Sequence, residues 1–106
     1  MTAPKRLRHK YGNTHVKRAG VAYASKAEAR YADKLRALQA AGEVVMFLEQ
    51  TTLRLPGGTR YVVDFVVFYR DGTVAWVDVK GHQTETFKVK KREIEAIYPI
   101  EIEVVS

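Results

Sequence analysis

Apolar side chains recur at helical spacing in only one long segment near the start of the chain. Over residues 25–41, Tyr31 and Leu35 belong to one apolar stripe. Ser25 can cap the first turn, and Glu28 stands three residues later, which is the spacing of a capping box. The pattern predicts an amphipathic helix over 25–41.

Strand-like segments follow this helix. Pro56-Gly57-Gly58 predicts a turn between two of them, Asp71-Gly72 predicts a hairpin, and the first strand is expected to bend near Glu49-Gln50. A short segment, residues 16–24, is ambiguous and fits a small hairpin. The main strands are predicted over residues 44–55, 60–69, 73–80 and 100–105.

A second helix is predicted to begin at Thr84 or Thr86, with Phe87, Ile94 and Ile97 on its apolar stripe. The element order is therefore helix, three strands as a meander, helix and strand. A helix between the third and last strands permits a right-handed crossover and a parallel pairing. These features predict an α/β or α+β fold with a mixed sheet.

Composition narrows the class of protein. A chain of 106 residues supports a single domain, and the absence of cysteine excludes a disulfide scaffold, a cysteine nucleophile and a cysteine metal site. No apolar run approaches the roughly 18 residues of a membrane span. No apolar h-region follows the basic N-terminus, so we expect a cytoplasmic protein rather than a secreted one.

The net charge of +6 is unevenly placed. Residues 19–106, the predicted domain, contain 12 basic and 12 acidic residues, whereas residues 1–18 contain six basic residues and no acid. A basic arm on a neutral body indicates a polyanionic partner such as nucleic acid, although a solvated tail that only aids solubility is the alternative. The basic residues of the arm are Lys5, Arg6, Arg8, Lys10, Lys17 and Arg18.

Two aspartates interrupt otherwise apolar strands. Asp64 lies seven residues before Asp71, and Asp78 lies six residues after Gly72, so the hairpin should place the two carboxylates nearly opposite each other. Alternation along the third strand puts Lys80 on the same face as Asp78. Two neighbouring acids repel each other unless a positive group lies between them, which indicates a divalent cation such as Mg²⁺.

A purely structural interpretation of these residues remains open. Asp64 can pair with Lys80, and Asp78 can cap the turn at Gly81. Glu28 has two interpretations as well, because the capping box explains it fully, yet it lies on the apolar stripe that faces the sheet. On that face it can be a third metal ligand.

Other polar residues give weaker signals. Gln50 lies within an apolar strand and can line the same site. The predicted second helix carries several basic residues on the face away from Phe87, including Lys88 and Lys91. That face is either a solvated surface or a contact surface for phosphates.

The ordered set of motifs resembles the PD-(D/E)XK nuclease superfamily, and within it a group of phage and prophage proteins that are Holliday-junction-resolvase-like. The resemblance covers nearly the whole chain and includes the D-x-K motif that begins at Asp78. Its motifs are Lys10-Tyr11-Gly12-Asn13, Ser25-Lys26-x-Glu28-Ala29, Gln50, Asp64-Phe65, Val77-Asp78-Val79-Lys80-Gly81 and Thr86-Phe87-Lys88-x-Lys90.

The resemblance implies a restriction-endonuclease-like core, an α/β fold with the order helix, three strands, helix, strand around a mixed central sheet. It implies that Asp64, Asp78 and Glu28 bind Mg²⁺, with Mn²⁺ as a substitute, and that Lys80 is catalytic. Asp78 stands where cellular resolvases often carry Glu, and the chain is short for a resolvase.

The expected function is that of a metal-dependent DNA endonuclease, with a four-way junction as the expected substrate. Symmetric cutting of two strands implies a C2 homodimer. The alternatives are a nicking, flap or repair nuclease of the same fold, a non-catalytic nucleic-acid-binding module, and a structural phage or ribosome-associated protein.

Overall fold

The computed structural model describes residues 16–18 and 20–106. This part of the chain forms two helices, α1 (Lys26–Ala40) and α2 (Glu85–Ile97), and a short 3-10 turn at Pro56–Gly58. None of its helices has the length and apolar character needed to cross a membrane. Its strands are β1 (Val16–Arg18), β2 (Val21–Tyr23), β3 (Val44–Arg54), β4 (Arg60–Tyr69), β5 (Val74–Val79) and β6 (Ile102–Val105).

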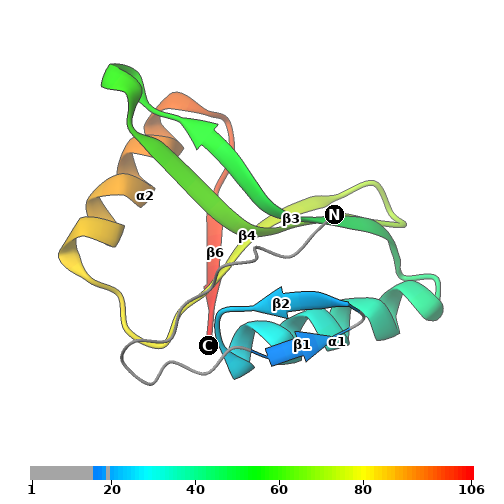
Figure 1. The fold of residues 1–106 in the computed structure, drawn as a ribbon. Helices are drawn as coiled ribbons and strands as arrows, with labels where there is room; N and C mark the ends of the chain where they lie inside the picture. The colour runs from blue at the N-terminus through cyan, green and yellow to red at the C-terminus, as the bar shows by residue number, and fades with distance from the viewer. Residues whose placement is uncertain (1–15, 19) are drawn as a thin grey trace.

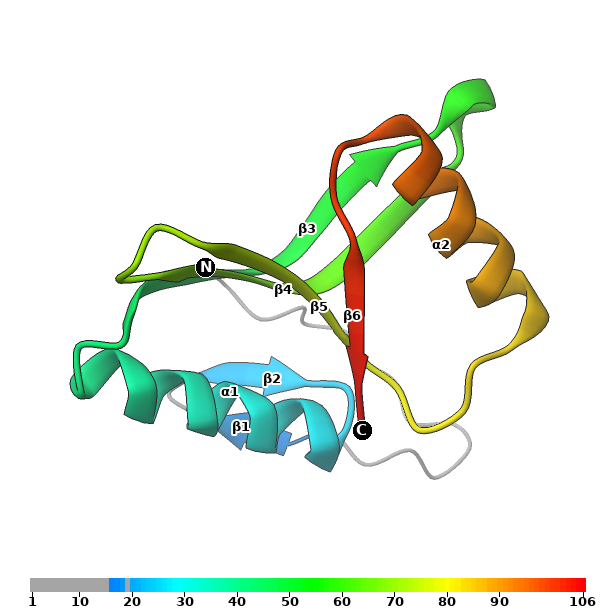
Figure 2. The same cartoon turned by 180° about the vertical axis from the view of Figure 1, so that it is seen from behind.

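Four strands form one mixed sheet in the order β3-β4-β5-β6. β3, β4 and β5 are antiparallel neighbours, whereas β5 and β6 are parallel and joined through α2. This arrangement confirms the predicted α/β class and the predicted parallel pairing. β1 and β2 form a separate antiparallel hairpin, which confirms the hairpin expected within residues 16–24. Figures 1 and 2 show this hairpin beside α1, while α2 lies against another part of the sheet.

α1 begins where its sequence predicts. Ser25 is the N-cap, and its hydroxyl accepts a hydrogen bond from the backbone N–H of Glu28 at 3.1 Å. The helix buries Ala32 and Leu35 completely against a core that includes Phe65 and the neighbouring strand β5. α1 is therefore fixed on the sheet by its apolar face, and Glu28 is carried on its first turn.

α2 is capped by Thr84, one of the two predicted starts, whose hydroxyl accepts from the N–H of Phe87 at 3.1 Å. Phe87 and Ile94 are buried in a second core with Tyr61 of β4. Ile97, the third residue of the predicted stripe, is 48% exposed. Ile97 is the last residue of α2, and the next residue, Tyr98, is the C-cap with an extended backbone.

The two cores meet at a bend in β3 and β4. Val63 and Phe65 have the same parity along β4, yet Val63 packs in the core of α2 and Phe65 in the core of α1. Pairing holds on both sides of this point, with Glu49 opposite Phe65 and Thr51 opposite Val63. Between them, Gln50 has a left-handed backbone with φ of 54°. The predicted bend near Glu49-Gln50 is thereby confirmed, and it lies beside Asp64.

Candidate functional site

The two strand aspartates meet across the hairpin. Phe65 pairs with Val77, so the next positions outward are Asp64 and Asp78. The backbone N–H of Asp64 donates to Asp78 Oδ1 at 3.0 Å, and the N–H of Val79 donates to Asp64 Oδ2 at 2.9 Å. Each carboxylate therefore accepts from the backbone of the other strand. The predicted juxtaposition of Asp64 and Asp78 is confirmed.

Asp78 is the more deeply buried of the two acids. It is 2% exposed, and its second oxygen accepts a hydrogen bond from the hydroxyl of Tyr61, a partner that the sequence did not reveal. Burial raises the pKa of Asp78, while the hydrogen bonds from Tyr61 and from the N–H of Asp64 oppose that rise. Both oxygens are thus engaged with protein donors, and Asp78 holds the strand geometry around Asp64.

Glu28 serves the helix cap and the candidate site at once. It is 7% exposed, and its Oε1 accepts from the N–H of Ala24 at 3.2 Å, just before the N-cap. Its Oε2 faces Gln50. Burial and the nearby Asp64 carboxylate raise the pKa of Glu28 to about 7. The capping and functional interpretations are therefore compatible, because each uses a different oxygen.

Gln50 lies between the two carboxylates. Its Nε2 donates to Glu28 Oε2 and to Asp64 Oδ1, with both distances 3.4 Å. A left-handed backbone costs a non-glycine residue roughly 1–2 kcal/mol, and such conformations are often found at functional sites. The bend aims the Gln50 amide at the gap between the acids, so the structure places this residue at the centre of the site.

Two clefts open on either side of Asp64. The larger, of about 790 Å³, lies beside the β1–β2 hairpin and is lined by Glu28, Gln50, Asp64 and Lys80. The smaller, of about 260 Å³, is lined by Asp64, Asp78 and Lys80 among others. Asp64 and Lys80 therefore form the wall that both clefts share. A third hollow, of about 640 Å³ next to Val74–Trp76 and residues 99–103, contains none of these residues.

Lys80 follows directly after β5. Its backbone N–H donates to Val105 O at 2.8 Å, which holds this position against β6. Its Nζ lies 5.0 Å from the centroid of the Phe87 ring. The positive charge of Lys80 opposes the rise in pKa that burial causes at Glu28 and at Asp78. Among the ion pairs of the described residues, none joins Lys80 to Asp64.

The carboxylate oxygens that converge at this site suit a hard divalent cation. Glu28 and Asp64 supply carboxylate oxygens that repel each other, and a cation between them would relieve this repulsion. The side-chain oxygen of Gln50 can serve as a neutral ligand if the amide turns over. Within residues 16–18 and 20–106, no three His, Asp or Glu side chains form a group with ligand geometry. Of the three acids that the resemblance implies as metal ligands, Glu28 and Asp64 face the Gln50 amide, whereas the two oxygens of Asp78 accept hydrogen bonds from Tyr61 and from the N–H of Asp64.

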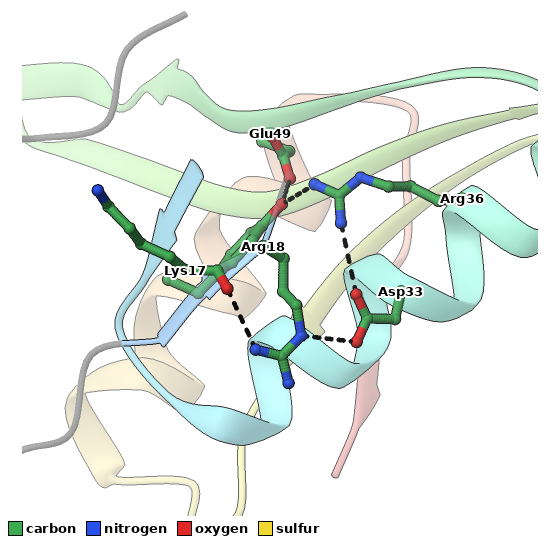
Figure 3. Close-up of polar contacts among 6 residues, drawn as sticks. Lys17, Arg18, Asp33, Arg36 and Glu49 are labelled. Atoms are coloured by element: carbon green, nitrogen blue, oxygen red, sulfur yellow. Dashed lines mark hydrogen bonds and ion pairs between the residues drawn. The ribbon is translucent and has the colours of Figure 1, made fainter. Parts of the chain in front are cut away.

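The predicted arm is only partly described. Lys5, Arg6, Arg8 and Lys10 lie outside the described residues. Lys17 and Arg18, which the sequence assigned to the arm, lie in β1. Arg18 Nε pairs with Asp33 Oδ2 on α1 at 3.0 Å, so this residue anchors the hairpin (Figure 3). Figure 3 shows the Lys17 side chain extending away from this network.

The same network reaches the strand next to the site. Asp33 also contacts Arg36, at 3.6 Å from Nη1, and Arg36 Nη2 donates to the Tyr23 hydroxyl at 2.6 Å. The Tyr23 hydroxyl donates in turn to Glu49, the residue before Gln50. Burial and the Glu49 carboxylate raise the pKa of Tyr23 to about 12, so the hydroxyl keeps its proton. The network therefore links the hairpin, α1 and β3 (Figure 3).

The two lysines singled out on α2 are engaged within the protein. Lys88 pairs with Glu85 at 3.5 Å on the exposed side of the helix. Lys91 pairs with Glu95 at 3.0 Å, and Glu95 accepts from the N–H of Ile102 at 2.7 Å. Lys91 therefore helps to fix α2 to the start of β6. The sequence missed Arg60, which lines the smaller cleft together with Lys90.

Comparison with known proteins gives a family but no function. Residues 8–104 match the family model described as "Protein of unknown function (DUF1064)". Searches of curated proteins and of solved structures found no match.

Proposed function

We propose that this chain, which belongs to the DUF1064 family, is a metal-dependent DNA endonuclease that cuts branched DNA such as a four-way junction. One observation carries the proposal. Glu28 and Asp64 face each other around the Gln50 amide, in a cleft whose wall includes Lys80. Repelling carboxylates beside a lysine are suited to a divalent cation and a phosphate substrate.

The architecture supports assignment to the PD-(D/E)XK superfamily. The order α1, β3, β4, β5, α2, β6 is the order that the resemblance implies for a restriction-endonuclease-like core. The site lies where Asp64 of β4 meets the end of β5, and α1 brings Glu28 to the same place. This correspondence supports both the fold family and the choice of site residues.

Each site residue has a distinct role in the proposed reaction. Glu28 and Asp64 would hold Mg²⁺ or Mn²⁺, which supplies a Lewis acid for the phosphate and a more acidic bound water. Asp78 fixes the backbone of Asp64 through its 3.0 Å hydrogen bond and is itself held by Tyr61. Lys80 would stabilise the negative charge that develops on the phosphate.

The arrangement favours an enzyme over a binding module. Burying the Glu28 carboxylate beside the half-buried Asp64 is costly, and the pKa of about 7 for Glu28 expresses that cost. A module that binds only the nucleic-acid backbone gains nothing from acids at its centre, because they repel phosphates. A nicking, flap or repair nuclease remains the alternative within the enzyme class.

The test is a cleavage assay with a matched control. A labelled four-way junction and a linear duplex are incubated with the protein in Mg²⁺, Mn²⁺ or Ca²⁺. We expect the junction to be cut in Mg²⁺ or Mn²⁺, and we expect Asp64→Asn and Lys80→Ala to slow cutting by about 100-fold or more. Glu101→Gln removes an exposed acid outside both clefts and should cut like the wild type.

A readout independent of catalysis is the calorimetric titration of DNA-free protein with Mn²⁺. Asp64→Asn should lose most of the binding, and Glu101→Gln should keep it. Cutting of flaps or nicks but not junctions would favour the alternative nucleases. Binding of DNA without cutting under any divalent cation would favour the non-catalytic module. Tight binding that ignores these substitutions would favour a structural role.

A resolvase also has to be a dimer, since two strands are cut symmetrically. We therefore propose a homodimer, and light scattering of the purified protein measures its mass directly. A monomer both alone and on the junction would argue against resolution of four-way junctions and leave the nuclease chemistry standing.

A further inference from the structure

The smaller cleft, which Glu28 does not line, is rich in basic side chains. Three cationic side chains line it, those of Arg60, Lys80 and Lys90. We propose that this cleft binds a backbone phosphate of DNA next to the one that reacts. This inference rests on the proposed function, since it places part of the same substrate.

Two of these cations are not engaged by acids of the protein. Within the described residues, the ion pairs involve Arg18, Arg36, Arg70, Lys88 and Lys91, and none involves Arg60 or Lys90. The acids in the cleft wall are Asp64 and Asp78, and Asp78 is buried against Tyr61. The charges of the exposed Arg60 and the half-buried Lys90 are therefore available to an anion.

An independent observation on β3 and β4 points to an anionic ligand. Arg54 pairs directly with Arg60 in the register of the hairpin, and both residues are exposed. Like charges directly opposite each other destabilise a strand pair. A phosphate beside Arg60 would relieve this repulsion, whereas a neutral ligand would not.

The position of the cleft identifies the kind of anion. Asp64 and Lys80 line both this cleft and the larger one that contains Glu28 and Gln50. A ligand that extends across this shared wall occupies both clefts at once, which fits a chain of phosphates better than a single small anion. Arginine can bind a phosphate through two parallel hydrogen bonds, and the hydroxyls of Thr84 and Thr86 add further donors to the wall.

The test compares two double variants that remove the same charge. Arg60→Ala/Lys90→Ala empties the cleft of two cations, whereas Arg70→Ala/Lys88→Ala removes two cations that are already paired with Glu43 and Glu85. Binding of a labelled four-way junction and of a duplex is measured by fluorescence anisotropy in Ca²⁺ over a series of salt concentrations. Thermal melting of each variant checks that it is folded.

Each phosphate contact adds about 0.9 to the slope of log affinity against log salt. We expect Arg60→Ala/Lys90→Ala to lower this slope by about 0.9, the value for one phosphate, and the affinity by at least about tenfold. Arg70→Ala/Lys88→Ala should change both far less. The charge-conserving pair Arg60→Lys/Lys90→Arg should retain the slope, which separates loss of charge from damage to the fold.

Equal losses of DNA affinity and of salt slope in the two double variants would overturn the inference, because they would show an effect of overall charge rather than of this cleft. Retention of wild-type binding by Arg60→Ala/Lys90→Ala would overturn it as well. In either case cutting by the wild type would leave the proposed nuclease intact. A wild-type protein that neither binds nor cuts DNA would overturn both proposals together.

Discussion

Replacement of Glu28 by Gln should stabilise the metal-free protein at alkaline pH. Glu28 is 7% exposed, and burial together with the Asp64 charge raises its pKa to about 7 from 4.5. A raised carboxyl pKa means that the folded state holds a proton which the unfolded state has already released. Ionisation of Glu28 therefore lowers the free energy of unfolding. This loss of stability is absent below about pH 4.5, grows as the pH rises, and is complete above about pH 7.

The magnitude follows from the size of the shift. A rise in pKa from 4.5 to about 7, at about 1.4 kcal/mol for each unit of pKa, destabilises the ionised wild type by about 3 to 4 kcal/mol. Glu28→Gln keeps a side-chain oxygen for the N–H of Ala24 and removes the charge. For a domain of this size, about 3 kcal/mol corresponds to a rise of roughly 10–20 °C in Tm.

The assay is urea unfolding in EDTA at pH 5 and at pH 8. We expect Glu28→Gln to exceed the wild type by about 3 kcal/mol at pH 8 and by less than about 1 kcal/mol at pH 5. Glu101→Gln, which removes an exposed acid, should show no such dependence on pH. Added Mg²⁺ should raise the stability of the wild type and affect Glu28→Gln less. An advantage of Glu28→Gln that is the same at both pH values would refute the reasoning.

Two further substitutions test the surroundings of the site. Tyr61→Phe leaves a buried oxygen of Asp78 without its hydrogen-bond donor and should lower the free energy of unfolding by about 1–3 kcal/mol. The control Tyr98→Phe removes a more exposed hydrogen bond to Arg54 O and should lower this free energy less. Equal losses of stability for the two variants in urea unfolding would contradict this prediction. Asp33→Ala removes the ion pairs with Arg18 and Arg36 at the surface, so it should lower the free energy of global unfolding by under about 1 kcal/mol. The same substitution should speed the hydrogen exchange of backbone amides in β1 and β2. Unchanged exchange in these strands would show that the ion pairs do not hold the hairpin.

Local patterns were enough to predict much of the fold. Ser25 caps α1 because a hydroxyl satisfies a free backbone N–H wherever a helix begins, independent of the rest of the chain. Asp71-Gly72 fixes the hairpin, and strand alternation then fixes the register that brings Asp64 beside Asp78. These features depend on residues close in sequence, and so the central pair of acids was predictable.

Long-range contacts decided the rest of the candidate site. Nothing near Gln50 in the sequence indicates a left-handed backbone, which occurs where β3 and β4 pass from one core to the other. The strand pattern treats Tyr61 as one more apolar residue, and only the fold shows that its hydroxyl donates a hydrogen bond to Asp78. Pattern reasoning placed Ile97 on the same stripe as Ile94, but Ile94 is buried and Ile97 is 48% exposed, because periodicity gives a helical stripe and not the burial of each residue on it.

The charges show the same division between sequence and tertiary structure. Composition alone gives a net charge of +6 and an excess of basic residues before residue 19. It does not tell which cations are already paired, and the fold engages Lys91 with Glu95 while leaving Arg60 in a cleft beside Asp64. Patterns along the chain are sufficient to predict the elements, the register and the sign of the charge, because these depend on neighbouring residues. The tertiary structure decided burial, pairing and the convergence of Glu28, Gln50 and Asp64, because these depend on residues that only folding brings together.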